Sequence, residues 1–243
     1  MHYYEKNIVE IKNEYTTFLI NILTPFLYDG IKSLYDQSIN EFNNINEKAK
    51  NTPNIVVPNI LLLFQKFLKS VINFSNIVIE NETNRIRNNS NCGAWFDDLV
   101  YAVIKSNIVL LTFSSCETSD VVDKKYHENI NINNFIHKCY IECAKKFYNY
   151  PELFWHKYSK LDIKKNQREI FSIIESSIKD AIRNSLPMNS ILKEFNPLKN
   201  EGNSFHYDEL NHWAIFYTIV RYMENYKFPF DKLNLFFLLF YYH

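Results

Sequence analysis

Four cysteines are the residues of this chain whose type most readily suggests chemistry. Cys139 and Cys143 lie four residues apart in a stretch with helical spacing, and Cys92 and Cys116 precede them. Thiolates bind zinc or act as nucleophiles. Structural zinc sites usually draw their ligands from close pairs within turns, whereas the one close pair here lies within a helix. The four thiols are weak metal candidates, and we expect buried, reduced side chains with no metal or cofactor.

One histidine near these thiols could support acid–base chemistry. His137 differs in helical phase from Cys139 and Cys143, so we expect it to hold a hydrogen bond between helices, with Glu142 or Asp98 as its partner. A catalytic thiol would also need a lowered pKa and an oriented base. An enzyme with a centre near Cys92, His137 and Cys143 is the alternative hypothesis.

Two adjacent carboxylates, Asp97 and Asp98, could be taken for a metal or acid–base pair. Neighbouring helical residues point about 100° apart, so the two do not converge on one ion. At a helix start they complement the partial positive charge, and we expect a salt bridge to Lys138 or Arg168. No phosphate-binding loop, dinucleotide fingerprint, nucleophile elbow or zinc-protease helix occurs in the sequence. The sequence therefore predicts no catalytic residue.

Large aromatic residues beside charged ones are candidate contacts with a partner. They are Trp95, Phe154, Trp155, Phe237 and Tyr241. Core anchoring is the commoner role for such residues, but tryptophan and tyrosine dominate binding hot spots. The last two lie in the apolar stretch 233–243, which we expect to fold back on the core or to dock on a partner.

A basic rim is the one feature with a nucleic-acid character, because tyrosines interleave with its cations. Its members are Lys157, Lys160, Lys164, Lys165 and Arg168. A solvated helix face explains such a rim at least as well. The whole chain carries 27 Lys+Arg and 27 Asp+Glu, a net charge of +0, whereas nucleic-acid binders usually have a basic surplus. We therefore expect no nucleic-acid partner.

The elements that must position these residues are predicted to be helices. The sequence has only 3 Gly and 7 Pro, with 47% hydrophobic and 16% aromatic residues, which favours an all-α, multi-helix bundle with a sizeable core. Apolar residues recur three or four apart. This spacing predicts helices over 6–23, 31–42, 59–79, 95–112, 133–147, 167–186 and 208–226, and the polar stretch 80–91 is predicted to be a solvated helix end.

The breaks between these helices define the expected organisation. Pro25 predicts a break near Thr24, and 43–58 and 114–131 are predicted to be loops. We expect one globular helical domain over 1–200 and a C-terminal helical segment over 201–243 that packs on the core or on a partner. No signal peptide and no apolar run long enough to span a bilayer are recognised, so we expect a cytosolic chain with no membrane span.

Several longer strings add a resemblance to a known family. They are 14–25, 95–99 with 102–107, 135–144, and 166–169 leading to 181–187. Over about 14–195 the chain resembles an uncharacterised helical family of nucleocytoplasmic large DNA viruses, which includes mimivirus relatives. The resemblance implies a virion or minor capsid component in the host cytoplasm, whose partners are other viral structural proteins or further copies. It supplies no active site, and the chain after Leu198 departs from the family's pattern.

We therefore expect a non-enzymatic structural or assembly protein that acts through protein–protein contacts. The alternative is an intracellular binding module for nucleic acid, or for a host or viral partner, that uses the basic rim.

Overall fold

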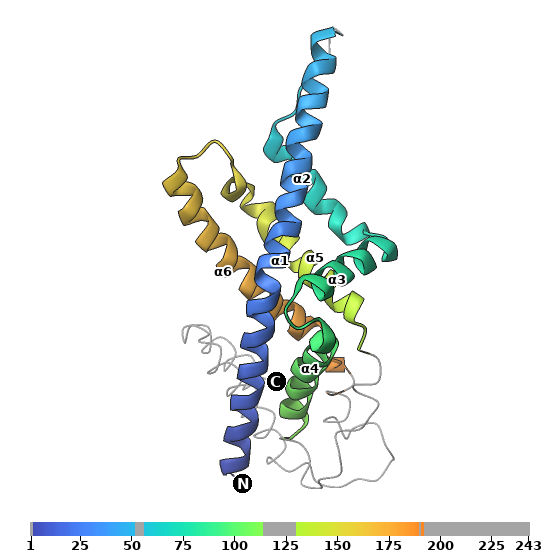
Figure 1. The fold of residues 1–243 in the computed structure, drawn as a ribbon, viewed down its shortest axis with the longest axis vertical. Coiled ribbons are helices and arrows are strands. Elements are labelled where there is room, and N and C mark those ends of the chain that lie inside the picture. Colours follow the sequence, from blue (N-terminus) through green and yellow to red (C-terminus); the bar gives the residue numbers. More distant parts are fainter. Residues whose placement is uncertain (1, 52–55, 114–129, 190, 192–243) are drawn as a thin grey trace, which may run out of the picture. The chain divides into compact units, whose positions relative to one another are not determined.

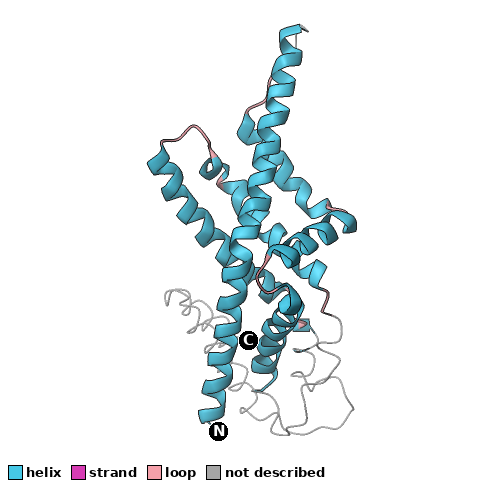
Figure 2. Ribbon diagram, in the orientation of Figure 1, coloured by secondary structure: helices cyan, strands magenta, loops and turns pink. Residues whose placement is uncertain are grey.

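The computed structural model describes residues 2–51, 56–113, 130–189 and 191, and most of these residues are helical (Figure 1). The described residues contain no strand, which confirms the predicted all-α class (Figure 2). The chain divides into two compact units, 1–192 and 193–243, and every described residue belongs to the first. The predicted helical segment 201–243, with Phe237 and Tyr241, lies outside the described residues, and so does Cys116.

Helix α1 (His2–Asn51) is the element against which α2, α4, α5 and α6 pack. Its buried stripe consists of Leu19, Leu23, Leu27 and Ile31, each 0% exposed. The stripe continues without a phase change across Pro25, so the predicted break near Thr24 is wrong. A proline inside a helix costs about 3 kcal/mol through the lost hydrogen bond and the ring clash. The proline ring lies on the exposed face of α1, so it does not interrupt the buried stripe. Burial of the stripe on both sides of Pro25 offsets the cost of the proline.

The end of α1 also corrects the sequence prediction. Residues 43–51 are helical rather than part of a loop, although the chain at 56–59 is not helical. Half-buried Phe42 and Ile45 continue the apolar face, and α1 packs against α2. Lys48 and Lys50 lie in the last turn, where cations stabilise the negative helix end.

One long helix is predicted from Asn59 to Ile79, and the structure breaks it into two. Helix α2 (Ile60–Ser70) begins at Asn59, whose side chain accepts from the Leu61 amide at 2.8 Å. A 3-10 turn over Val71–Asn73 follows, and α3 (Asn76–Asn89) begins after the capping side chain of Ser75. The two helical pieces are bent by 98°. Two serine side chains at the bend satisfy backbone groups: Ser70 donates to the Phe67 carbonyl, and Ser75 accepts from the Val78 amide.

Three further helices complete this unit. They are α4 (Phe96–Phe113), α5 (Ile132–Asn149, capped by Asn131) and α6 (Lys160–Asn184, capped by Ser159). The faces predicted to be inward are buried: Ile136, Cys139, Tyr140, Cys143 and Phe147 on α5, and Ile170, Ile174, Ile178, Ala181 and Ile182 on α6. No single helix among the described residues is long and apolar enough to cross a membrane, and only the bent pair 60–73 and 76–89 meets that test jointly.

Candidate functional site

A pocket of about 370 Å³ opens where α1, the α2–α3 bend and α5 meet, and we call it the Gly30 pocket. Its walls combine apolar side chains with a similar number of polar ones. They are formed by Gly30, Ser33, Leu34, Gln37, Phe74, Val78, Ile79, Asn81, Glu82, Arg85, Ile136, His137 and Tyr140.

Gly30 determines how closely α5 approaches α1 at this pocket. A Cβ at position 30 would overlap with the hydroxyl and ring of Tyr140. Gly30 lies within the long helix α1, where glycine costs roughly 0.5–1 kcal/mol relative to alanine. The missing side chain therefore makes room for the Tyr140 ring, which is only 5% exposed.

Three polar side chains of the pocket, those of Glu82, Arg85 and Tyr140, pair with one another. The Tyr140 hydroxyl donates to Glu82 Oε1 at 2.5 Å. Two N–H groups of Arg85 donate to the same carboxylate, at 2.7 and 2.8 Å. Arg85 also donates to the Phe26 carbonyl of α1 at 2.9 Å. Both oxygens of Glu82 are thus engaged, and the arrangement ties α3 to α1 and α5. Charge-assisted bidentate bonds of this kind are stronger than neutral ones and fix geometry.

The protonation states of Tyr140 and Arg85 indicate a structural role rather than a role in proton transfer. Burial raises the pKa of the Tyr140 phenol well above its ordinary value, and the neighbouring Glu82 charge adds to the shift. Glu82 in turn raises the pKa of the Arg85 guanidinium. The phenol therefore remains protonated and the guanidinium charged at neutral pH, so neither acts as a base there.

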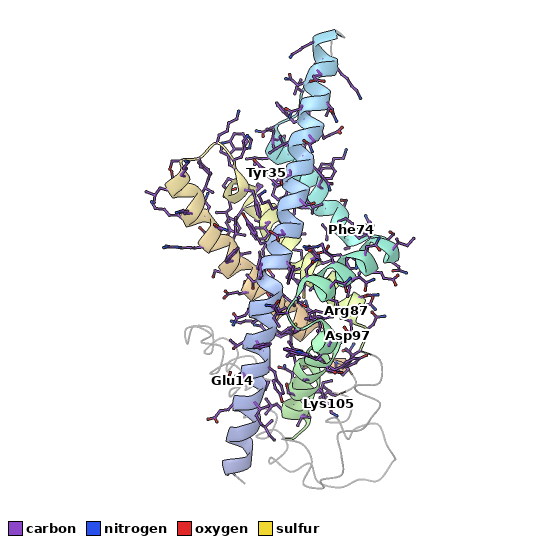
Figure 3. The ribbon with its side chains drawn as sticks, viewed as in Figure 1. Glu14, Tyr35, Phe74, Arg87, Asp97 and Lys105 are labelled. Carbon is purple, nitrogen blue, oxygen red and sulfur yellow. The ribbon has the colours of Figure 1, made fainter. Side chains whose placement is uncertain are left out.

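His137 of α5 contacts the α2–α3 bend and stabilises it. Its Nε2 donates to the Val71 carbonyl at 2.8 Å, and its ring stacks on Phe74 at 6.5 Å. Val71 is where α2 changes into the 3-10 turn, so the histidine pairs a carbonyl at the start of the bend. The expected hydrogen bond between helices is present, but its partner is Val71 rather than Glu142 or Asp98. Figure 3 shows Phe74 beside this bend.

An apolar rim continues the pocket onto the surface. Ile72, Ile77 and Val78 at the α2–α3 bend are 61%, 69% and 46% exposed. Val78 also lines the pocket, so its side chain joins the exposed residues to the hollow. Exposed aliphatic side chains at a bend that borders a concave surface are typical of a protein-binding site.

Comparison with known proteins assigns the chain to a family. A family model described as a family of unknown function (DUF5764) matches residues 5–155. The chain belongs to this family. No curated protein and no solved structure matches it. The DUF5764 match contains all residues that line the Gly30 pocket, whereas α6 lies beyond it.

The three cysteines that the structure describes in this DUF5764 protein are packed as small apolar residues. Cys92, Cys139 and Cys143 are reduced and buried. Burial raises the pKa of Cys139 well above its ordinary value and that of Cys143 to about 12, so both remain thiols at neutral pH. Within the residues that the structure describes, no three His, Cys, Asp or Glu side chains gather where they could hold a metal ion.

The residues of the alternative catalytic centre have separate structural partners. Cys143 is hydrogen-bonded to Ser177 of α6, and Cys92 lies 3.4 Å from the Ser90 hydroxyl just before α4. His137 is held by the Val71 carbonyl. None of these contacts joins a thiol to the imidazole, which is the pairing that a nucleophile and its base require.

The carboxylate of Asp97 has a different partner from the two predicted. Arg87 of α3 contacts both of its oxygens, at 2.9 and 3.0 Å (Figure 3). Lys138 instead donates to the Asn184 carbonyl at the end of α6, at 2.9 Å. Arg168 is an exposed residue of α6. The predicted bridge to Lys138 or Arg168 is therefore wrong for Asp97, while both Asp97 and Asp98 do lie in the first turn of α4.

The aromatic contact candidates divide into surface and core. Trp95 is 42% exposed and stacks on Phe18 of α1, which is 49% exposed, with centroids 5.5 Å apart. Trp155 is half-buried. Phe154 is only 8% exposed and packs edge-on against Phe64 and Phe147, so it is a core residue and not a contact.

Sequence reasoning missed most of the pocket. The polar composition of 80–91 predicts a solvated helix end, yet Thr83 and Ile86 are 0% exposed there and Glu82 and Arg85 are half-buried. One available signal was Gly30, an isolated glycine in a helical pattern, which often marks a close approach of another element. The second signal was the i,i+3 spacing of Glu82 and Arg85 on the same stretch.

Proposed function

We propose that this protein is a non-enzymatic structural or assembly component that acts through contacts with other proteins. The observation that carries the proposal is the Gly30 pocket with its exposed aliphatic rim. An apolar side chain of a partner would enter the hollow beside Val78, and Ile72 and Ile77 would be covered around it. Burying each such aliphatic side chain contributes about 1.5–3 kcal/mol, enough for specific binding by a few residues.

The polar groups of the pocket support binding rather than catalysis. Glu82, Arg85 and Tyr140 satisfy one another, and His137 donates to a backbone carbonyl. These four side chains lose little hydration when a partner docks, because their polar atoms already have partners. The same pairing leaves these side chains poorly suited to move protons during a reaction.

The resemblance to a family of large DNA viruses supports a more specific form of the proposal. The protein would be a virion or minor capsid component of such a virus, present in the host cytoplasm during assembly. Its partners would be other viral structural proteins or further copies of itself. Quantitative mass spectrometry of purified particles tests this: we expect a fixed ratio to the other particle proteins, and complete absence from particles would overturn the viral assignment.

Site-specific crosslinking tests the protein contact directly. Val78 and Leu62 both occupy the third position of a helix and are 46% and 60% exposed, but only Val78 lines the pocket. A benzophenone amino acid is placed at one position or the other in cells that make the protein naturally. We expect one dominant protein adduct from position 78 and only background from position 62.

Substitutions at the same two positions measure the contact with the crosslinked partner. Val78→Asp places a charge at the pocket and should weaken binding at least tenfold, whereas Leu62→Asp should leave it unchanged. An acidic residue is compatible with the first turn of a helix, so both variants should fold. Equal crosslinking from the two positions, or equal binding by the two variants, would contradict the proposal.

A further inference from the structure

The start of α6 and the loop before it form a charged tip, which we define as residues 155–169 (Figure 1). Five cations lie in it, against the two carboxylates of Asp162 and Glu169. All members of the basic rim predicted from sequence are exposed. Asp162 is occupied locally: the Ser159 hydroxyl donates to it at 2.6 Å, and Lys165 lies 3.8 Å away. The tip therefore presents a positive surface although the whole chain is neutral.

The position of these cations is electrostatically unfavourable for the helix itself. The start of a helix carries a partial positive charge, so lysines there lower its stability by a few tenths of a kcal/mol each. Lys160 and Lys164 lie in the first two turns of α6, and Lys157 precedes it. A local cost of this kind is expected where residues serve binding rather than folding.

An exposed leucine stands among these cations. Leu161 is 63% exposed and shares a helix face with Lys164, Lys165 and Arg168, at i, i+3, i+4 and i+7. That face is opposite the buried stripe of α6, so packing within the unit does not explain the leucine. Tyr158 and Ile163, 39% and 40% exposed, lie beside it in the sequence.

The tip is held in place by the rest of the unit. The Tyr35 hydroxyl of α1 lies 2.8 Å from His156 Nδ1 and accepts from the His156 amide at 3.3 Å. Asn166 donates to the Leu153 carbonyl at 3.4 Å. A fixed loop presents Tyr158 and Leu161 without an ordering cost on binding, which favours a surface contact.

We propose that the α6 tip binds the surface of a membrane that contains anionic lipids. Lysines and arginine would contact the headgroups, and Leu161 with Tyr158 would enter the interfacial layer. This combination of cations, an aromatic residue and exposed aliphatic side chains is typical of interfacial binding. Nucleic acid would use the cations and Tyr158 but offers nothing to exposed Leu161, so this leucine favours the membrane.

Vesicle cosedimentation of the full chain tests this proposal. The vesicles contain either phosphatidylcholine alone or phosphatidylcholine with about 30% phosphatidylserine. We expect binding only to the second kind, weakened when NaCl rises from about 0.05 M to about 0.5 M, because salt screens the headgroup charge. Lys164→Glu should weaken binding at least about fivefold, the value expected for one cation near such a surface.

Matched variants separate the charge from the apolar contact. Lys179→Glu makes the same exposed charge change further along α6 and should have little effect. Leu161→Ser keeps the charge and should weaken binding roughly tenfold. Leu62→Ser, at a leucine that is 60% exposed on α2, should not. All four substitutions replace exposed side chains, so the free energy of unfolding should change by no more than about 0.5 kcal/mol.

Three results would overturn the proposal. One is equal sedimentation with neutral and anionic vesicles. Another is equal weakening by Lys164→Glu and Lys179→Glu, or by Leu161→Ser and Leu62→Ser. The third is binding to duplex DNA that Lys164→Glu weakens while anionic vesicles are not bound, which would assign the tip to nucleic acid.

Discussion

The backbone of Gly30 on α1 lies directly against the hydroxyl and ring of Tyr140 on α5, with no room for a Cβ between them. From this position the Tyr140 hydroxyl reaches Glu82 on α3 at 2.5 Å. Three helices distant in sequence therefore meet at one point, and the approach depends on one residue without a side chain. The Gly30 pocket is formed around this point.

Replacement of Gly30 by alanine should destabilise the protein. The same change in an ordinary helix interior stabilises by about 0.5–1 kcal/mol, so the sign is the informative result. Here the added methyl overlaps with Tyr140, and overpacking of this kind typically costs about 1–3 kcal/mol. Urea denaturation followed by circular dichroism measures the change in the free energy of unfolding.

A second substitution shows whether Tyr140 is the cause. In a Tyr140→Leu background the ring and hydroxyl are absent, so Gly30→Ala should cost much less than in the wild-type protein. The coupling between the two positions should be about 1–3 kcal/mol in a double-mutant cycle. Additive effects would show that the clash is relieved elsewhere.

Loss of one partner of the Glu82–Arg85 ion pair should destabilise the protein, because the other charge is then left unpaired. The two side chains are 23% and 35% exposed, and Arg85 also donates to Phe26. Arg85→Met leaves a half-buried carboxylate and should cost about 1–3 kcal/mol. Adding Glu82→Gln removes the stranded charge and should recover part of that loss. Thermal unfolding of the wild-type protein, Arg85→Met and the double variant gives the comparison, and no recovery would contradict the pairing.

Helical spacing was sufficient to predict the all-α class and the buried faces of α5 and α6. Cys139, Tyr140 and Ile174 lie inside as predicted, because their burial follows from periodicity along a single helix. The pocket could not be predicted in the same way. Its geometry depends on Gly30, Glu82 and Tyr140, which come from three helices, and periodicity within each helix does not specify how the helices meet.

Two of the wrong boundaries have tertiary causes as well. A proline usually ends a helix when only the local sequence is considered. Here packing on both sides of Pro25 stabilises α1, and the helix continues through it. The opposite occurs at Val71, where apolar spacing predicts a continuous helix and the chain bends by 98°. Ser75 and His137 supply the hydrogen bonds that stabilise this bend, and one of them comes from a distant helix.

Replacement of Pro25 by alanine should stabilise the protein. The ring lies on the exposed face of α1, and alanine restores an amide that can donate to the Asn21 carbonyl one turn earlier. We expect a gain of about 1–3 kcal/mol, or roughly 2–4 °C in Tm for each kcal/mol. Differential scanning calorimetry measures it. Asn21→Ala, also on the exposed face, is the control and should change Tm little. A lower Tm in Pro25→Ala than in the wild-type protein would mean that the proline fits a local distortion of α1.

The thiols of α5 should make stability depend on alkaline pH. Cys139 and Cys143 have raised pKa values in the folded protein, about 12 for Cys143 against an ordinary 9.0. The thiols are protonated in both states below pH 9, so their contribution is then constant. Above it the unfolded chain releases protons that the folded chain keeps, which lowers the free energy of unfolding by up to about 1.4 kcal/mol per pH unit for each thiol. We expect urea denaturation between about pH 8 and 11 to show that the free energy of unfolding declines less steeply in Cys139→Ala/Cys143→Ala than in the wild-type protein. Tyrosine ionisation contributes equally to both proteins, so the difference in slope reports the two thiols. Equal slopes would mean that the thiols ionise in the folded state.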